Sequence, residues 1–290
     1  MKNYILSSKS DDFDYALLDS GEGRRLERFG KRLISRPDGN VLWSKTAPEK
    51  WHNLAAEFKV GSSEKGWEYT DKEAEEGWTI AWKNCRFLVK PTPFRHMGLF
   101  PEQAVNWEWL REKIVENPDR KVRVLNLFAY TGAASVVAAK AGAQVCHVDA
   151  SVGSIKWAQD NARASNLSET AIRWIADDVL KFLRREVRRG NHYDVIMLDP
   201  PVFGRGPKGE IFRLEERLEE LLQLCNQLLS EKPLGFLLNF YATALYPESV
   251  ARLATSILNK KFNKSLELAS LCIEEEASDN LLPTGFLLRS

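Results

Sequence analysis

Five consecutive residues near the middle of the chain could hold the acceptor of a group transfer. Asp199 to Phe203 reads Asp-Pro-Pro-Val-Phe and follows a strongly apolar run. The two prolines cannot extend a sheet and impose a rigid, extended turn. Asp199 and the free carbonyl of Pro200 can then accept hydrogen bonds from an amine or a ring N–H, while Phe203 offers a stacking face for a planar acceptor. We therefore interpret these three residues as catalytic, and a purely structural Pro-Pro turn is the alternative.

A glycine turn earlier in the chain could approach a nucleoside. Val122 to Ala129 is apolar enough for a buried strand and breaks at Tyr130-Thr131-Gly132 into an alanine-rich helix. Gly132 has no Cβ, so the backbone can come close to a ligand there. The turn lacks the Gly-x-Gly-x-x-Gly pattern, which makes it weak evidence by itself.

Acidic residues end the next two expected strands. Asp149 lies 17 residues after Gly132, where a carboxylate could accept both ribose hydroxyl hydrogens. Asp177 and Asp178 follow the third strand, where a carboxylate could accept from an adenine amino group. We favour Asp178 for this contact, although one of the two could merely cap the next helix. For Asp149, a solvated or capping role is the alternative.

The segment after the proline corner predicts a mobile loop over the site. Gly204 to Gly209 reads Gly-Arg-Gly-Pro-Lys-Gly. Its Arg205 and Lys208 could meet a phosphate of the substrate.

The elements that position these residues alternate between strand and helix from Val122 onward. This order predicts an α/β fold, a Rossmann-like domain of seven strands covered by helices on both faces. In such a sheet the ligand lies beyond the carboxyl ends of the strands. The expected strands are Val122 to Ala129, Gln144 to Asp149, Ile172 to Ile175, Tyr193 to Leu198, Leu234 to Phe240, Ser265 to Ile273 and Leu281 to Leu288.

Residues 1–95 predict a small β-rich N-terminal domain for substrate recognition, and 96–290 the catalytic domain. Seven of the nine tryptophans lie before residue 110, where they could stack bases or simply form the core. Two basic clusters could contact RNA, although a solvated helix face is the alternative for the second. The first comprises Arg24, Arg25, Arg28, Lys31, Arg32 and Arg36, and the second Arg184, Arg185, Arg188 and Arg189.

Composition sets the outer limits on function. A net charge of +1 neither demands nor excludes a polyanionic partner, so any RNA contact must come from a local patch. No apolar run is long enough for a signal peptide or a membrane span, which predicts a cytoplasmic protein without a membrane partner. The four cysteines are far apart and have no histidine at ligand spacing, which predicts free thiols and no metal site.

Two motifs resemble those of class I S-adenosylmethionine-dependent methyltransferases. They are Asn126 to Gly132 (Asn-Leu-Phe-Ala-Tyr-Thr-Gly) and Asp199 to Phe203, within a likeness that covers roughly residues 90 to 290. The closest group contains the bacterial 23S ribosomal RNA large-subunit methyltransferases for a cytosine C5 and a guanine N7. The resemblance implies S-adenosylmethionine as cofactor, S-adenosylhomocysteine as product and ribosomal RNA as substrate. We assign the cofactor to Asn126, Phe128, Ala129, Tyr130, Thr131, Gly132, Asp149, Ala150, Asp177, Asp178 and Asp199.

A further stretch resembles the same family with two departures. Met97 to Gln103 is similar to the family's Thr-Gly-x-Phe-x-Asp-Gln, which lies beside the cofactor pocket and implies pocket roles for Phe100 and Gln103. Glu102 replaces the usual aspartate and Ala104 the usual arginine.

The third departure bears on mechanism. The cytosine C5 members carry a nucleophilic cysteine after the fifth strand, where this chain reads Leu238-Asn239-Phe240-Tyr241. Methylation of a cytosine carbon needs a thiolate that adds to the ring, whereas a nitrogen lone pair can attack the methyl directly. We therefore expect in-line transfer to a nitrogen, or to an oxygen, with Asn239 or Tyr241 lining the acceptor pocket.

Three functions compete at this point. RNA methylation leads, methylation of a small molecule or protein is the alternative enzyme, and a non-catalytic binding protein is the third. The missing glycine-rich pattern disfavours a nicotinamide dehydrogenase. We expect a monomer or a homodimer.

Overall fold

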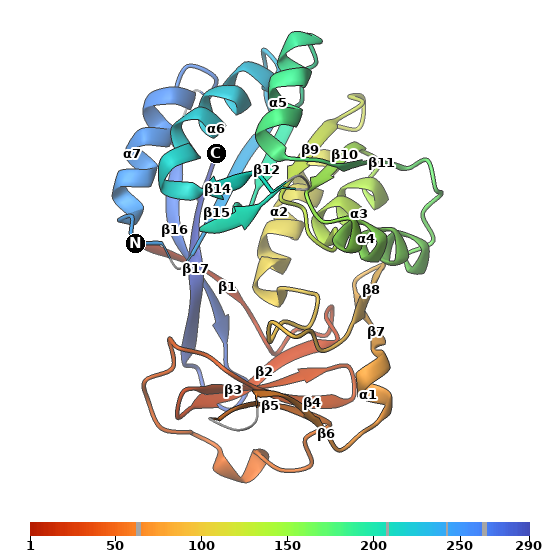
Figure 1. Cartoon of the computed structure of the whole chain (residues 1–290), viewed down its shortest axis with the longest axis vertical. Helices are drawn as coiled ribbons and strands as arrows, with labels where there is room; N and C mark the ends of the chain where they lie inside the picture. The colour runs from red at the N-terminus through yellow and green to blue at the C-terminus, as the bar shows by residue number, and fades with distance from the viewer. Residues whose placement is uncertain (62–64, 207–208, 242, 263–265) are drawn as a thin grey trace. The chain divides into compact units, whose positions relative to one another are not determined.

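The computed structural model describes residues 1–61, 65–206, 209–241, 243–262 and 266–290 (Figure 1). Its contacts divide the chain into two units. The α/β unit comprises Met1–Asn3, Asn106–Ser270 and Gly285–Ser290, and the β unit comprises Tyr4–Val105 and Leu271–Thr284. These bounds differ from the expected division into 1–95 and 96–290, chiefly because residues 271–284 group with the β unit.

The large sheet has the expected α/β topology, with one strand more than expected. In the described residues it has eight strands in the order β1-β16-β17-β15-β12-β9-β10-β11 (Figure 1). The additional strand is β1, at the N-terminus, whose short apolar segment gave no sign of joining this sheet. Strands β11, β10, β9, β12 and β15 pair in parallel, and β17 pairs antiparallel with β15. The strands are β1 (Lys2–Leu6), β9 (Arg123–Leu127), β10 (Gln144–Asp149), β11 (Ile172–Ala176), β12 (Val195–Leu198), β15 (Gly235–Phe240), β16 (Glu267–Glu274) and β17 (Leu281–Arg289).

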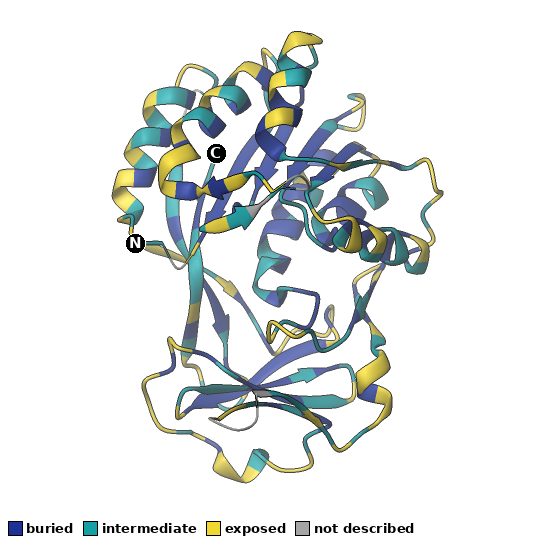
Figure 2. Cartoon of the chain, in the orientation of Figure 1, coloured by how far each residue is buried: buried dark blue, intermediate teal, exposed yellow. Residues whose placement is uncertain are grey.

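Helices cover both faces of this sheet (Figures 1 and 2). Leu125, Leu198 and Phe236 are buried on the face of α5 (Val179–Arg188), α6 (Leu214–Leu228) and α7 (Pro247–Leu258). Alternate strand residues point to the opposite face, which is covered by α2 (Ala104–Val115), α3 (Ala133–Lys140) and α4 (Val152–Ala164).

A close approach of helix to strand depends on one glycine. A Cβ at Gly235 of β15 would lie 2.7 Å from Cη2 of Trp109 in α2. The absence of a side chain at Gly235 therefore lets the indole of Trp109 pack directly on the strand.

The β unit contains a five-stranded sheet and a two-stranded sheet among its described residues. Tyr15, Phe29 and Phe58 are fully buried in it. The five-stranded sheet consists of β2 (Tyr15–Gly21), β3 (Arg24–Phe29), β4 (Arg32–Pro37), β5 (Ala56–Val60) and β6 (Lys65–Tyr69), and the other of β7 (Trp78–Trp82) and β8 (Cys85–Val89). Short helices are η1 (Pro48–Lys50), α1 (Glu73–Glu76) and η2 (Pro101–Gln103).

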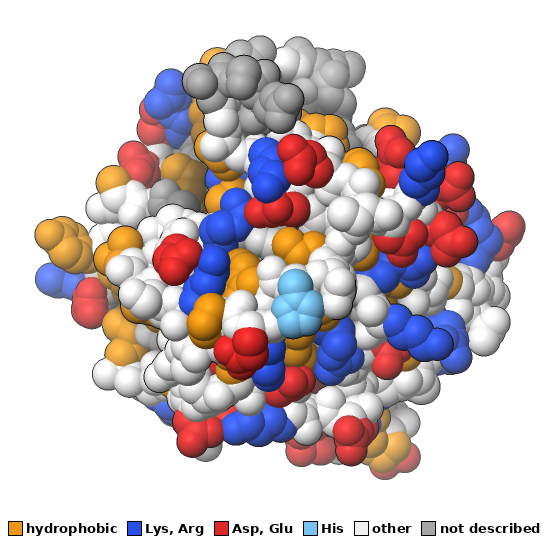
Figure 3. Space-filling view, turned by 90° about the horizontal axis from the view of Figure 1, so that it is seen from below, with side chains coloured by type: hydrophobic (Ala, Val, Ile, Leu, Met, Phe, Trp, Pro, Cys, Tyr) orange, Lys and Arg blue, Asp and Glu red, His pale blue; other side chains and the backbone are white. Residues whose placement is uncertain are grey.

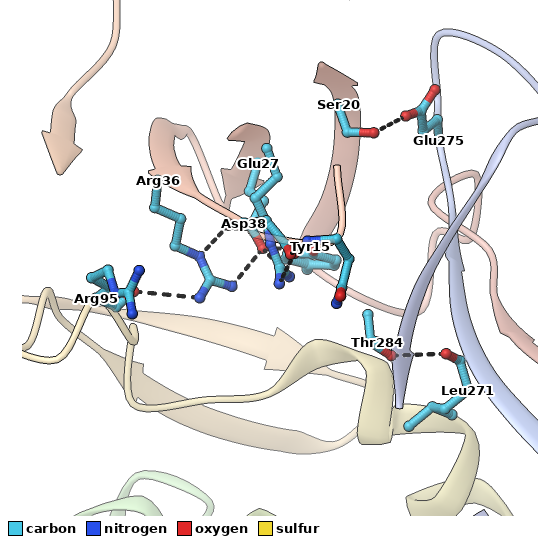
Figure 4. A network of polar contacts seen from close by, with 11 residues as sticks. Tyr15, Ser20, Glu27, Arg36, Asp38, Arg95, Leu271, Glu275 and Thr284 are labelled. Carbon is cyan, nitrogen blue, oxygen red and sulfur yellow. Dashed lines mark hydrogen bonds and ion pairs between the residues drawn. The ribbon is translucent and has the colours of Figure 1, made fainter. Parts of the chain in front are cut away.

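A buried network of charges lies on this β sheet (Figure 4). The carboxylate of Glu27 accepts the Tyr15 hydroxyl at 2.9 Å and two N–H groups of Arg36 at 2.5 and 2.9 Å. Burial by itself raises the pKa of Glu27, but the guanidinium groups of Arg36 and Arg25 outweigh burial and lower it. Arg25 pairs in turn with Asp38 at 2.5 Å. These contacts link β2, β3 and β4 through Tyr15, Glu27 and Arg36.

Candidate functional site

The register of the parallel strands brings the ends of four strands to one edge of the sheet. Leu127 of β9 lies opposite both Val148 of β10 and Leu198 of β12, and Leu198 lies opposite Leu238 of β15. The residues that follow these four positions are Phe128, Asp149, Asp199 and Asn239. The sheet thus aligns the expected cofactor and acceptor residues along its carboxyl edge, beside the point where the strand order reverses between β9 and β12.

The glycine turn after β9 has a strained backbone. Phe128, Tyr130 and Gly132 have positive φ angles of 54°, 49° and 78°. For the two non-glycine residues this conformation costs roughly 1–2 kcal/mol each. Hydrogen bonds from Ala129 N to the Val148 carbonyl and from Tyr130 N to Asp149 Oδ2, 3.1 and 2.8 Å long, hold the turn in this shape.

Only glycine fits at position 132. A Cβ there would lie 2.7 Å from Cβ of Ala158 in α4 and 3.2 Å from Cε1 of His147. The Asn161 amide of the same helix donates to the Thr131 carbonyl at 2.8 Å. Helix α4 therefore packs directly on the turn, and the missing Cβ of the buried Gly132 makes room for this helix rather than for a ligand.

Three buried polar side chains next to the turn are linked in a row. The Asn126 amide donates to Ser135 Oγ at 2.9 Å, and Ser135 Oγ lies 3.0 Å from Nδ1 of His147. Burial lowers the pKa of His147 to about 3, so its imidazole is neutral. Our sequence analysis missed Ser135 and His147, although a histidine inside an apolar strand was a signal that could have found the pair.

Asp149, for which we expected a ribose contact, is the last residue of β10. Its Oδ1 accepts the Ser151 N–H and its Oδ2 the Tyr130 N–H, both at 2.8 Å. Burial raises the pKa of Asp149, and the two backbone N–H groups oppose that rise. A carboxylate has about four acceptor positions, so two hydroxyl groups can still be accommodated. Ala150, which follows, is partly buried.

Asp177 and Asp178 have different structural partners. Asp178 Oδ1 accepts the Lys181 N–H at 2.9 Å and caps α5. Asp177 Oδ1 accepts the Asp178 N–H at 2.8 Å, while its Oδ2 pairs with Arg185. The capping role that the sequence allowed for one of the two therefore belongs to Asp178, and its expected adenine contact would use the other oxygen.

The proline corner leads into a short hairpin that includes Gly204 and Arg205, the first two residues of the expected loop. Asp199 is partly buried and Pro200 buried, and two short strands follow: β13 (Phe203–Arg205) and β14 (Ile211–Arg213). We expected a loop because Gly204 to Gly209 is rich in glycine. Composition does not reveal that Gly204 and Arg205 pair with Phe212 and Ile211. Phe203 is 50% exposed. Lys208 and the side chain of Arg205 lie outside the described residues.

Asn239 and Tyr241 lie at the end of β15. Asn239 is buried, and its Oδ1 accepts from the Asn106 amide of α2 at 3.1 Å. Tyr241 follows the strand and is 42% exposed. Their expected roles in the acceptor pocket stay predictions.

Phe100 and Gln103 belong to the β unit. The Phe100 ring lies 5.0 Å from that of His96, and Gln103 N donates to the Phe100 carbonyl at 3.1 Å in η2. Their expected roles beside the cofactor stay predictions.

Most arginines of the two basic clusters that we considered for RNA are paired with acidic side chains, while Lys31 and Arg188 are exposed. In the first cluster, Arg24 pairs with Glu57, Arg25 with Asp38, Arg28 with Glu276, Arg32 with Asp71 and Arg36 with Glu27. In the second, Arg184 pairs with Glu220, Arg185 with Asp177 and Arg189 with Glu186. Figure 3 likewise shows positive and negative side chains interspersed on one face of the molecule.

The remaining composition-based expectations concern thiols, metals and membranes. All four cysteines are buried, and burial raises the pKa of Cys146 to about 11. Within the described ranges no group of three or more His, Cys, Asp or Glu side chains could hold a metal ion. None of the helices in those ranges has the length and apolar character needed to cross a membrane.

Comparisons with known proteins point to one family. The family model of S-adenosylmethionine-dependent methyltransferases matches residues 45–245. A solved S-adenosylmethionine-dependent methyltransferase from Agrobacterium tumefaciens is 37% identical, with a TM-score of 0.89 over 99% of this chain and 94% of that one.

Two curated relatives act on ribosomal RNA according to their names. The large-subunit methyltransferase K/L of Pseudoalteromonas translucida is 36% identical over 75% of this chain, and methyltransferase I of Aeromonas salmonicida is 31% identical over 90% of it. The chain spans only 29% and 64% of those proteins, respectively. The resemblance found in the motifs and the α/β fold class is confirmed, and the chain belongs to the family of S-adenosylmethionine-dependent methyltransferases.

Proposed function

We propose that this protein methylates a nitrogen of an RNA base, with ribosomal RNA in the cytoplasm as its substrate. The observation that carries the proposal is the alignment of Asp149, Asp199 and Asn239 at one sheet edge beside the glycine turn. This edge offers acceptors for a nucleoside cofactor and for an amino or imino acceptor within one site.

The residues around the turn fit S-adenosylmethionine. The partly buried carboxylate of Asp149, which is joined to the turn through the Tyr130 N–H, can accept ribose hydroxyls. Asp178 or Asp177 would accept the adenine amino group, and the other residues of Asn126 to Gly132 would line the pocket. When bound, the cofactor supplies an electrophilic methyl group on a sulfonium.

The proline corner would hold the acceptor. Asp199 and the Pro200 carbonyl would accept hydrogens from an exocyclic amine or ring N–H and so aim its lone pair in line with the methyl group. Phe203 would stack on the ring, and Asn239 and Tyr241 would line the pocket. No covalent intermediate with the protein is needed.

The burial of all four thiols favours a nitrogen atom as the methyl acceptor. A cytosine carbon requires an attacking thiolate, but all four cysteines are buried and burial raises the pKa of Cys146, Cys225 and Cys272. No cysteine lies directly after β15, where the carbon-methylating members of the family carry their nucleophile. Direct attack by a nitrogen therefore fits these residues better than carbon chemistry.

A small molecule or a protein is the second candidate substrate. The net charge of +1 and the pairing of the Arg24–Arg36 cluster with acids favour it, because neither provides a broad attraction for a polyanion. The names of the ribosomal RNA methyltransferase relatives favour RNA.

Methyl transfer to RNA tests the proposal directly. Purified protein and labelled S-adenosylmethionine are incubated with RNA from a strain lacking the gene and with RNA from its parent. We expect labelling of the first RNA only, because the second already carries the methyl group. Equal labelling of both, or of neither, would count against RNA, and free nucleosides and protein extracts serve as the alternative acceptors.

Two variants connect this activity to the site. Asp199→Ala should abolish turnover and leave cofactor affinity nearly intact, whereas Asp160→Ala should leave both unchanged. Asp160 is the matched control because it is a 38% exposed aspartate on α4, paired with Arg163. Calorimetry that showed binding of NAD instead of S-adenosylmethionine would remove the proposal.

A further inference from the structure

The hairpin after the proline corner has two different faces. Phe203 lies opposite Arg213, Gly204 opposite Phe212 and Arg205 opposite Ile211. Since residues directly opposite in an antiparallel pair share a face and successive residues alternate, Gly204 and Phe212 lie on one face. Phe203, Ile211 and Arg213 lie on the other.

The face with Phe212 anchors the hairpin to the site. Phe212 is 6% exposed, and its ring lies 5.1 Å from that of Phe128 in the glycine turn. The Leu214 N–H donates to the Val202 carbonyl at 3.0 Å, which closes the base of the hairpin. The hairpin is thus fixed both to the cofactor turn and to the proline corner.

The opposite face presents an aromatic ring and a cation to solvent. Phe203 is 50% and Ile211 56% exposed, and the Arg213 side chain is 57% exposed. The Arg213 guanidinium carbon lies 5.8 Å from the centre of the Phe203 ring. Its ion pair with Glu216 is 3.6 Å long between two exposed groups. Such a pair is weak and easily exchanged for another anion.

An exposed ring with a guanidinium carbon 5.8 Å from its centre can match the two parts of a nucleotide. A base stacks on an aromatic side chain, and a planar guanidinium pairs with a phosphate. We propose that Arg213 is a specificity-determining residue that binds the phosphate next to the base stacked on Phe203. It would select a polynucleotide over a free base, a nucleoside or a protein side chain. This inference rests on the proposed RNA methylation.

Arg217 provides a matched control for Arg213. It lies one helical turn further on in α6, its side chain is 46% exposed, and it pairs with Glu220 at 3.4 Å with the same i,i+3 spacing. It is not part of the hairpin. Replacing either arginine removes the same charge and the same kind of surface ion pair.

The experiment measures KM for an RNA acceptor at several salt concentrations in the wild type, Arg213→Ala, Arg213→Lys and Arg217→Ala. Arg213→Ala should raise KM about tenfold, the effect of about one charge-assisted hydrogen bond. It should also make the dependence of log KM on log salt shallower by about 0.7, the value for one phosphate on a single strand. The salt slope should recover in Arg213→Lys, and Arg217→Ala should match the wild type, with cofactor affinity unchanged throughout.

The outcomes separate this inference from the proposed function. A wild type that methylates RNA, together with an Arg213→Ala variant of unchanged salt slope, would overturn the role of Arg213 alone. A wild type that methylates a small molecule or protein but no RNA would remove both proposals. A change in Arg213→Ala that also lowers cofactor affinity and is not recovered by Arg213→Lys would indicate damage to the hairpin and contradict a phosphate contact.

Discussion

The carboxylate of Asp149 and the backbone N–H of Tyr130 are joined by a hydrogen bond of 2.8 Å. This bond ties the end of β10 to the strained turn after β9, while Ser151 N–H occupies the other carboxylate oxygen. Asp149 therefore shapes the turn in addition to its proposed contact with ribose. Both tasks require the ionised carboxylate, which burial disfavours.

We expect cofactor affinity to fall as the pH is lowered. Burial raises the pKa of Asp149 above its usual value of 3.8, so the acceptor form of the carboxylate is lost as the pH falls through that raised pKa. Calorimetry with S-adenosylmethionine between pH 7 and 4 measures this loss. Asp149→Asn should bind about tenfold more weakly at pH 7, with little further change down to pH 4. Equal affinities of the two proteins at pH 7 would contradict the role of Asp149.

Gly132→Ala should damage the turn through a collision. The added Cβ would lie 2.7 Å from that of Ala158, at a φ of 78°. Backbone strain and overpacking together should lower the unfolding free energy by about 2–4 kcal/mol and weaken cofactor binding. Denaturant unfolding and calorimetry measure the two effects.

Two further variants separate strain from collision. Gly142→Ala also has a positive φ, 99°, but its Cβ would have nothing within 4 Å, so it should show the strain alone. Adding Ala158→Gly to Gly132→Ala removes the colliding atom and should restore part of the lost stability. No recovery in the double variant would show that the contact with α4 does not limit this position.

Local signals were sufficient to predict the core of the fold. The strand ending at Leu127, the turn at Gly132 and the acid at Asp149 each show in a short stretch of sequence, because a buried parallel strand is a continuous apolar run. The carboxyl ends of such strands meet at one edge, so the positions of Asp149, Asp199 and Asn239 followed from topology alone.

Non-local pairing explains what was missed. Gly204 to Gly209 has the composition of a loop, and only the packing of Phe212 on Phe128 shows why strands flank it. The basic cluster suggested an RNA patch because the partners of Arg24 and Arg32, Glu57 and Asp71, lie more than 30 residues further along the chain. Charge pairing across strands is not visible in the order of residues.

The stability of the protein should depend on the neutral state of His147. Its pKa is lowered by burial from 6.5 to about 3, so the unfolded chain takes up a proton there at a higher pH than the folded one. Stability from this group is complete above pH 6.5 and is lost as the pH falls towards 3. Urea unfolding of the wild type at pH 7, 6, 5 and 4 should show this decline.

A variant separates His147 from the other groups that titrate in this range. His147→Gln keeps a polar side chain near Ser135 but has no proton to gain, so its stability should fall less steeply between pH 6.5 and 4. It should be less stable than the wild type at pH 7, because the imidazole packing on Trp174, with ring centres 4.8 Å apart, is lost. Parallel pH profiles for the two proteins would show that His147 stays protonatable in the folded state.

Methyl transfer should survive exposure of the native enzyme to a thiol reagent. Cys146 and Cys225 are 4% and 0% exposed, and burial raises the pKa of Cys146 to about 11, so neither presents a thiolate at neutral pH. Iodoacetamide should leave the folded protein unmodified and active, while mass spectrometry of the urea-unfolded protein should show alkylation of all four cysteines. Rapid loss of activity with one cysteine modified in the folded protein would instead indicate a reactive thiol, and would favour carbon methylation through a covalent adduct over direct attack by a nitrogen.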